Sequence, residues 1–133
     1  MTGRKWRWCG KDCVTKFFIL SGDVGAMRAH LLKRDKGICA ICGCDTILIK
    51  EISRAIPYED RGFLFDKIGF GKVSGNRYDL WDVDHIVPHS MGGTHDPENL
   101  RTACIGCHKH VTKKFAHSRS RAGMIAQENL FND

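Results

Sequence analysis

Residues 81–114 carry the side chains in this chain that are best suited to chemistry on a phosphate group. Asp84 and His85 end a stretch rich in β-forming residues, Asn99 follows fourteen residues after His85, and His108 follows nine residues after Asn99. A carboxylate and an imidazole can hold a divalent cation, and a second imidazole, with an ordinary pKa near ~6.5, suits a general base at neutral pH. The set predicts metal-assisted cleavage of a phosphodiester.

Each of the four residues has an expected role. Asp84 and His108 hold one catalytic cation, Mg²⁺ or Mn²⁺, although the imidazole ligand also admits Ni²⁺ or Zn²⁺. His85 deprotonates the attacking water, and Asn99 fixes the tautomer of His85 through a ring N–H bond. Because adjacent residues of a regular strand point to opposite faces, we expect a bend or bulge at Asp84–His85.

Four of the seven cysteines form two CxxC pairs, Cys39 with Cys42 and Cys104 with Cys107. Two thiolates at this spacing form a knuckle for a tetrahedral zinc ion, so the two pairs predict one structural zinc site with four cysteine ligands. Cys44 is near enough in the sequence to compete as a ligand. Cysteines used in this way favour an intracellular, reducing compartment over one that forms disulfides.

The order Asp-His, Asn, His at these spacings resembles the HNH, or ββα-metal (His-Me finger), endonuclease family. The CxxC before the last histidine, paired with an earlier CxxC, resembles the zinc-bearing branch of that family. This supports pairing cysteines that are separated by 61 residues. The chain also resembles the nuclease domains of zinc-finger Ran-binding annealing helicases, in its W-C-x3-C opening, its long insertion and its W-x-V-D-H-I strand. The family resemblance implies the same roles for Asp84, His85, Asn99 and His108.

These features predict an α+β fold with a ββα-metal core, a zinc-bound knuckle, a helical N-terminal extension and an insertion between the CxxC pairs. We expect a strand over residues 78–87 and a helix that opens at Cys104, with Asp23 and Asp45 as helix caps. The apolar pattern fades between Tyr58 and Asn76. Three regions follow: an N-terminal basic and aromatic segment with helices at 1–36, a zinc-bearing nuclease core at 37–120 that includes the insertion 45–77, and a tail or short helix at 121–133.

The net charge of +6 and the isoelectric point near 9.0 favour a polyanionic partner. The expected phosphate contacts lie on or after the last major helix, and they would position DNA without reading its sequence: Lys109, Lys113, Lys114 and Arg119. No apolar run is long enough to cross a membrane, and the basic start leads into polar residues, so we expect neither a membrane span nor a signal peptide.

The sequence therefore predicts a metal-dependent DNA endonuclease that is weakly sequence-specific or structure-dependent. The alternative is a catalytically inactive, zinc-stabilised DNA-binding module. The resemblance to the HNH family implies 5′-phosphate and 3′-hydroxyl products. Resemblance to the annealing helicases implies a branched or forked substrate and a motor partner in another chain or a missing region. Nucleus or bacterial cytoplasm, repair or restriction, and the oligomeric state stay open. Cys9 and Cys13 are interpreted as small core residues, and the alternative is the remaining half of a small treble-clef-like finger.

Overall fold

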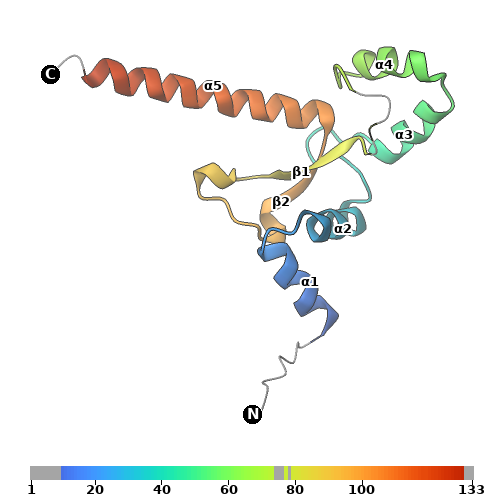
Figure 1. The fold of residues 1–133 in the computed structure, drawn as a ribbon, viewed down its shortest axis with the longest axis horizontal. Helices are drawn as coiled ribbons and strands as arrows, with labels where there is room; N and C mark the ends of the chain where they lie inside the picture. Colours follow the sequence, from blue (N-terminus) through green and yellow to red (C-terminus); the bar gives the residue numbers. More distant parts are fainter. Residues whose placement is uncertain (1–9, 74–76, 78, 131–133) are drawn as a thin grey trace, which may run out of the picture.

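The computed structural model describes residues 10–73, 77 and 79–130. Its centre is a two-stranded sheet with helices on three sides (Figure 1). In chain order the elements are α1 (Lys11–Leu20), α2 (Val24–Asp35), α3 (Thr46–Arg54), α4 (Tyr58–Lys67), β1 (Trp81–His85), the 3₁₀ turns η1 (His89–Met91) and η2 (Pro97–Asn99), β2 (Leu100–Cys104) and α5 (Ile105–Leu130).

The two strands pair antiparallel in an unbroken register from Trp81 opposite Cys104 to His85 opposite Leu100. No extra residue interrupts either strand, so the predicted bend or bulge at Asp84–His85 is wrong. The strand ends at His85 instead, and the amide of the next residue, Ile86, still bonds to the Asn99 carbonyl at 2.8 Å. Regular alternation puts Asp82 and Asp84 on one face and His85 on the other.

Local signals place the helices that support this sheet. The Asp23 side chain accepts from the Ala26 amide at 2.7 Å, and Asp45 accepts from the Leu48 amide at 3.0 Å, which confirms both predicted caps. α2 then packs one side of the sheet through a core of Ile19, Met27, Leu31, Trp81 and Leu100. Cys13 is only half-buried on α1 and lies outside this core, and Cys9 falls outside the described residues.

The insertion contains a helix that the sequence pattern did not predict. α4 covers Tyr58–Lys67, in the region where the apolar pattern fades. Its Phe65 is buried with Phe70, Leu80 and Ile105 in a second core that also includes Cys39 and Cys104. The insertion is therefore packed against the cysteine-bearing side of the sheet.

α5 extends well beyond the sheet, running continuously for 26 residues and crossing residue 121, where a separate tail was expected to start (Figure 1). Its first turn follows β2 directly, so residues at the start of the helix face β1. Within the described part of the chain, no helix is both long and apolar enough to span a membrane.

Candidate active site

Asp84 lies next to the end of β1, on the face of the sheet toward α5, and is 6% exposed. Its Oδ2 accepts a hydrogen bond from Nε of Arg101, the residue directly opposite on β2, at 2.6 Å. This ion pair fixes the carboxylate and satisfies one of its oxygens. The other oxygen, Oδ1, points toward the first turn of α5.

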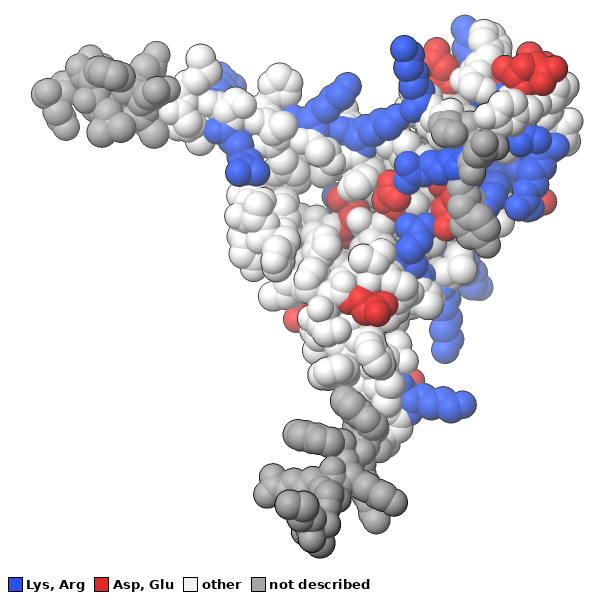
Figure 2. All heavy atoms as spheres, viewed as in Figure 1, with Lys and Arg blue, Asp and Glu red and all other residues white. Residues whose placement is uncertain are grey.

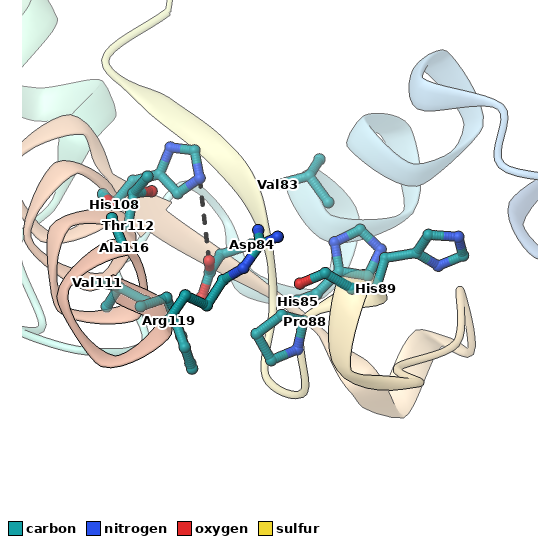
Figure 3. A pocket seen from close by; sticks show the side chains of 12 residues that line it. Val83, Asp84, His85, Pro88, His89, His108, Val111, Thr112, Ala116 and Arg119 are labelled. Carbon is teal, nitrogen blue, oxygen red and sulfur yellow. Dashed lines mark hydrogen bonds and ion pairs between the residues drawn. The ribbon is translucent and has the colours of Figure 1, made fainter. Parts of the chain in front are cut away.

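His108 is the residue of α5 that meets this oxygen. Its Nε2 lies 3.9 Å from Oδ1 of Asp84, across the opening drawn in Figure 3. Cation–ligand bonds of about 2.1 Å allow one ion to lie between two atoms at this separation. The donor pair of one carboxylate oxygen and one neutral imidazole nitrogen therefore fits a divalent cation.

The other ring nitrogen of His108 contacts a second carboxylate. Nδ1 lies 3.3 Å from Oδ2 of Asp82, and Asp82 is itself held by Arg77 at 2.6 Å and 2.7 Å. The hydrogen bond with Asp82 raises the pKa of His108, and the same bond lowers the pKa of Asp82. A carboxylate on the far ring nitrogen is the usual way in which a protein orients a metal-binding histidine.

His85 lies on the opposite side of β1 from Asp84 and still borders the same cavity of about 320 Å³. In Figure 3 it lies beside His89, across the opening from the helix that carries His108. Burial lowers the pKa of His85, and the neighbouring His95 lowers it further. The cavity extends past the strand end, so Asp84 and His85 both reach it without a distortion of the strand.

Asn99 does not have the predicted partner. Its amide nitrogen donates to the carbonyls of Thr94 at 2.8 Å and Val87 at 3.1 Å, and its Oδ1 accepts from the Val87 amide. Both N–H groups of the Asn99 amide thus hold the loop between the strands together. They replace regular backbone hydrogen bonds, of which this loop has few. The His85 ring is bonded to His95 instead, at 3.0 Å.

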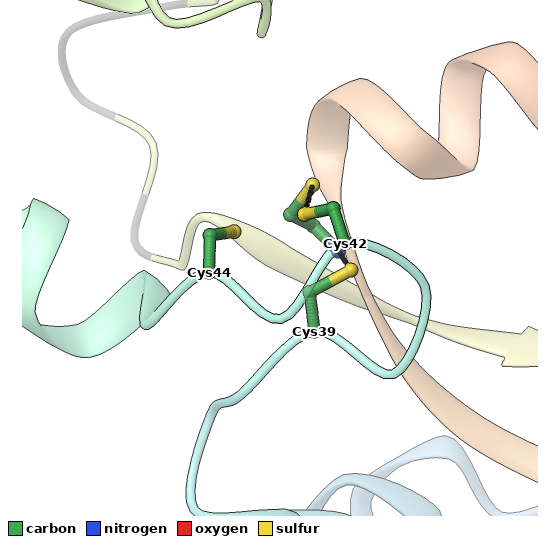
Figure 4. Close-up of side chains that lie close together, drawn as sticks. Cys39, Cys42 and Cys44 are labelled. Atoms are coloured by element: carbon green, nitrogen blue, oxygen red, sulfur yellow. Dashed lines mark hydrogen bonds between the residues drawn. The ribbon is translucent and has the colours of Figure 1, made fainter.

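A cluster of thiols lies behind the site, at the junction of the knuckle and α5. The sulfur atoms of Cys39, Cys42, Cys44 and Cys104 all lie within 4.8 Å of one another (Figure 4). The Cys42 and Cys104 sulfurs are 3.8 Å apart, which is about the separation set by Zn–S bonds of ~2.3 Å in a tetrahedron. The cluster fits a zinc ion.

Cys107 was predicted as the fourth ligand, and Cys44 takes its place in this group. Cys107 remains a neighbour, since its amide lies 3.4 Å from the Cys104 sulfur. Burial raises the pKa of both Cys44 and Cys107. Although burial also opposes ionisation of Cys39, surrounding backbone N–H groups lower its pKa to about 6, so this thiol is ready to act as a ligand.

Comparisons with known proteins agree with this geometry. Residues 70–114 match the model of the HNH endonuclease family. The crystal structure of the human ZRANB3 HNH domain superposes with a TM-score of 0.58 at 25% identity, covering 77% of this chain and 97% of that one. The chain contains an HNH domain.

Two curated relatives extend the match along the chain. The DNA annealing helicase and endonuclease ZRANB3 of Mus musculus is 29% identical over 131 residues, and that of Homo sapiens is 28% identical over 126 residues. These alignments cover 90% and 86% of this chain, but only 12% of either relative. The chain thus corresponds to a small part of those proteins, and the predicted family and ββα-metal fold are confirmed.

Of the four predicted DNA contacts, Lys109 is bonded to the insertion, whereas the other three lie at the surface or at the cavity. The Lys109 ammonium donates to the carbonyls of Phe70 at 3.1 Å and Lys72 at 2.9 Å, so it ties α5 to the insertion and is poorly placed for phosphates. Lys113 and Lys114 are exposed. Figure 2 shows Lys and Arg side chains along α5 and over the α3–α4 end of this face. Arg119 borders the cavity itself.

Sequence reasoning missed three residues that contact the predicted ones. Asp82 precedes Asp84 by two, and strand alternation alone was enough to place both on the face of His108. Arg101 lies opposite Asp84 because of the register in which the two strands pair, and this register cannot be read from the sequence. His95 carried no pattern that linked it to His85, because both lie at the ends of an irregular loop.

Proposed function

We propose that this chain is a metal-dependent endonuclease that hydrolyses DNA phosphodiester bonds. The observation that supports the proposal most directly is the 3.9 Å separation between Asp84 Oδ1 and His108 Nε2, beside a cavity that His85 also borders. A carboxylate, an imidazole and a separate base are the groups that such a reaction needs.

Each of the chain's own residues has a task in this mechanism. Asp84 and His108 hold a divalent ion, Mg²⁺ or Mn²⁺, with Ni²⁺ or Zn²⁺ as further candidates; when bound, this ion neutralises charge on the phosphate and steadies the leaving oxygen. His85 takes one proton from a water, whose oxygen bonds to phosphorus while the bond to the 3′ oxygen breaks and that oxygen takes up a proton from solvent. The products are a 5′-phosphate and a 3′-hydroxyl. Asn99 supports the reaction indirectly, because it holds the loop that follows His85 in place.

The second metal in the proposal is structural. Zinc held by cysteines would join the knuckle at Cys39 and Cys42 to Cys104, at the junction of β2 with α5. The fourth ligand is Cys44 or Cys107. Structural zinc typically contributes on the order of 10 kcal/mol to folding, which suits a small domain with two modest cores.

DNA binding in the proposal depends on charge more than on base contacts. Exposed Lys113 and Lys114 and the cavity residue Arg119 contact phosphates, so cleavage is weakly sequence-specific or structure-dependent. The ZRANB3 relatives are described as DNA annealing helicases and endonucleases, which supports branched or forked DNA as a substrate and a motor in another chain or region. An intracellular, reducing location, in a nucleus or a bacterial cytoplasm, goes with the thiol ligands.

One observation favours the alternative of an inactive DNA-binding module. Arg101 already pairs with the Asp84 carboxylate at 2.6 Å, so part of the charge that would attract a cation is compensated within the protein. An inactive module would bind DNA in a salt-sensitive way and would show no metal-dependent cleavage.

Plasmid nicking separates the two functions. The chain is incubated with supercoiled plasmid in Mg²⁺, Mn²⁺ or EDTA, beside its zinc content by elemental analysis. We expect nicking that EDTA stops, and a loss of about two orders of magnitude in His85→Ala with DNA binding and zinc retained. His30→Gln, on α2, is the matched control. DNA binding without nicking in either metal would establish the inactive module.

A further inference from the structure

Three histidines at and beyond the end of β1 are connected, because His95 contacts both His85 and His89. His85 Nε2 lies 3.0 Å from His95 Nδ1, and the planes of the two rings form an angle of 62°. The His95 ring is stacked on His89 at a centroid distance of 5.1 Å and an angle of 9°. The proposed mechanism uses only His85, so the other two have no task in it.

A 3.0 Å contact between two ring nitrogens contains one N–H, and its position decides which form of His85 is present. If His85 donates from Nε2, its Nδ1 carries a lone pair and can act as a base. If His95 donates from Nδ1, a neutral His85 carries its proton on Nδ1 and offers no lone pair to the cavity. The partner of Nε2 therefore controls whether His85 can take a proton.

His95 is held in a fixed position beside His85 by its neighbours. His89 lies flat against it and donates its own Nδ1–H to the Gly93 carbonyl at 3.1 Å, while Asn99 holds the carbonyl of the adjacent Thr94. On another side is the turn between α1 and α2, where a Cβ on Gly22 would lie 3.2 Å from His95 Nε2. The ring is thus confined by the loop and by the helical extension.

We propose that His95 is a positioning residue for the general base: its Nδ1 accepts the Nε2–H of His85 and leaves Nδ1 of His85 free for water. This inference rests on the proposed nuclease function. During the reaction the water proton moves to Nδ1, and the imidazolium formed keeps its Nε2–H bonded to His95. A third group that orients a base in this way usually raises its efficiency. Here the orienting group is an imidazole and not the predicted Asn99.

The tautomer of His85 can be measured without any cleavage. Two-bond ¹H–¹⁵N spectra of the imidazole rings distinguish Nε2–H from Nδ1–H in neutral histidine. We expect the Nε2–H form of His85 in the unmodified chain and in His95→Gln, whose amide oxygen can accept the same bond. In His95→Phe, which keeps a ring for the stack but no acceptor, we expect a mixture. A neutral His85 that is Nδ1–H in the unmodified chain would overturn the inference.

Cleavage kinetics supply a second readout. His95→Phe should lower kcat about tenfold or more with KM nearly unchanged, His95→Gln should recover most of this loss, and His30→Phe should have no effect. Equal rates in all three variants would contradict the inference. Failure of the proposed function would look different: the unmodified chain would not nick plasmid, or His85→Ala would nick it normally, whatever the tautomer.

Discussion

Asp82 illustrates how much a site depends on residues that do not touch the substrate. Its carboxylate contacts the ring nitrogen of His108 that faces away from Asp84, and Arg77 holds it in turn. The two aspartates of β1 thus lie beside different ring nitrogens of His108: Asp82 beside Nδ1 and Asp84 beside Nε2. Asp84 would share an ion with His108, whereas Asp82 would keep the ring turned toward that ion.

We predict that Asp82→Asn weakens binding of the catalytic cation by about 10- to 100-fold. The amide removes the charge that orients His108 and makes its Nε2 a better ligand. Mn²⁺ titration followed by electron paramagnetic resonance measures the affinity without DNA. Asp79→Asn is the matched control, because Asp79, like Asp82, pairs with Arg28 but makes no contact with His108 among the described residues. Equal affinity in the two variants would contradict this role.

The two histidines of the site have pKa values shifted in opposite directions. Burial lowers the pKa of His85, and the hydrogen bond with Asp82 raises that of His108. His85 therefore stays able to act as a base at a lower pH than a histidine with an ordinary pKa. Conversely, His108 must lose a proton to bind a cation, and it retains this proton above 6.5 until the cation displaces it.

This difference predicts a pH profile that depends on the metal concentration. At low Mn²⁺, kcat/KM should rise with pH through a value above 6.5, because proton loss from His108 limits metal binding. At saturating Mn²⁺ the rise should move below 6.5, where His85 loses its proton beside Asp84, His89 and His95. Plasmid nicking from pH 5 to 8 at two Mn²⁺ concentrations measures both. A profile that does not move with Mn²⁺ would rule out His108 as the limiting ligand.

Among the elements, α5 has two functions that its sequence does not distinguish. Its first turn carries His108 to β1, and its lysines face either the insertion or solvent. Lys109 belongs to the first group, since it bonds to two carbonyls near residues 70–72. Lys113, one turn further on, is exposed.

Substituting these two lysines should therefore have different effects. We predict that Lys113→Met lowers DNA affinity and reduces the slope of log K against log salt by about one, with little change in Tm. Lys109→Met should lower Tm while leaving that slope unchanged, because its bonds are internal. Salt-dependent fluorescence anisotropy and thermal unfolding measure the two quantities. The opposite result would mean that the Lys109 contacts open when DNA binds.

The sequence predicts these elements best where a local rule decides their form. The caps at Asp23 and Asp45 follow from single residues and their neighbours, and the β-forming residues of 78–87 predict the strand that is found at Trp81–His85. α4 was missed because Gly62 and the 68%-exposed Phe63 break its apolar stripe. The pair of Asp84 with Arg101 and the contact of His85 with His95 depend on strand register and loop closure, which no local pattern specifies. The prediction of a bulge at Asp84–His85 was wrong because it assumed that both side chains must lie on one face of the strand to reach the same site.

At the scale of the whole molecule, the thiol cluster lies where otherwise separate parts meet. Cys39 and Cys104 belong to the core that α4 and the insertion complete, and Cys104 ends β2 directly before α5 begins. The helix that carries His108 is thereby fixed to the knuckle. A zinc ion here would hold the knuckle and the ββα core together, although it takes no part in the chemistry.

Removal of zinc should therefore unfold the domain and not merely inactivate it. We predict one zinc per chain, and a large fall in Tm when a strong chelator or Cys104→Ser removes it, since structural zinc contributes on the order of 10 kcal/mol. Cys44→Ser and Cys107→Ser identify the fourth ligand, because only the true ligand should lower both zinc content and Tm. A Cys44 ligand would match the group of sulfurs within 4.8 Å, and a Cys107 ligand would match the paired CxxC motifs. Full stability of Cys104→Ser without zinc would show instead that the two apolar cores suffice.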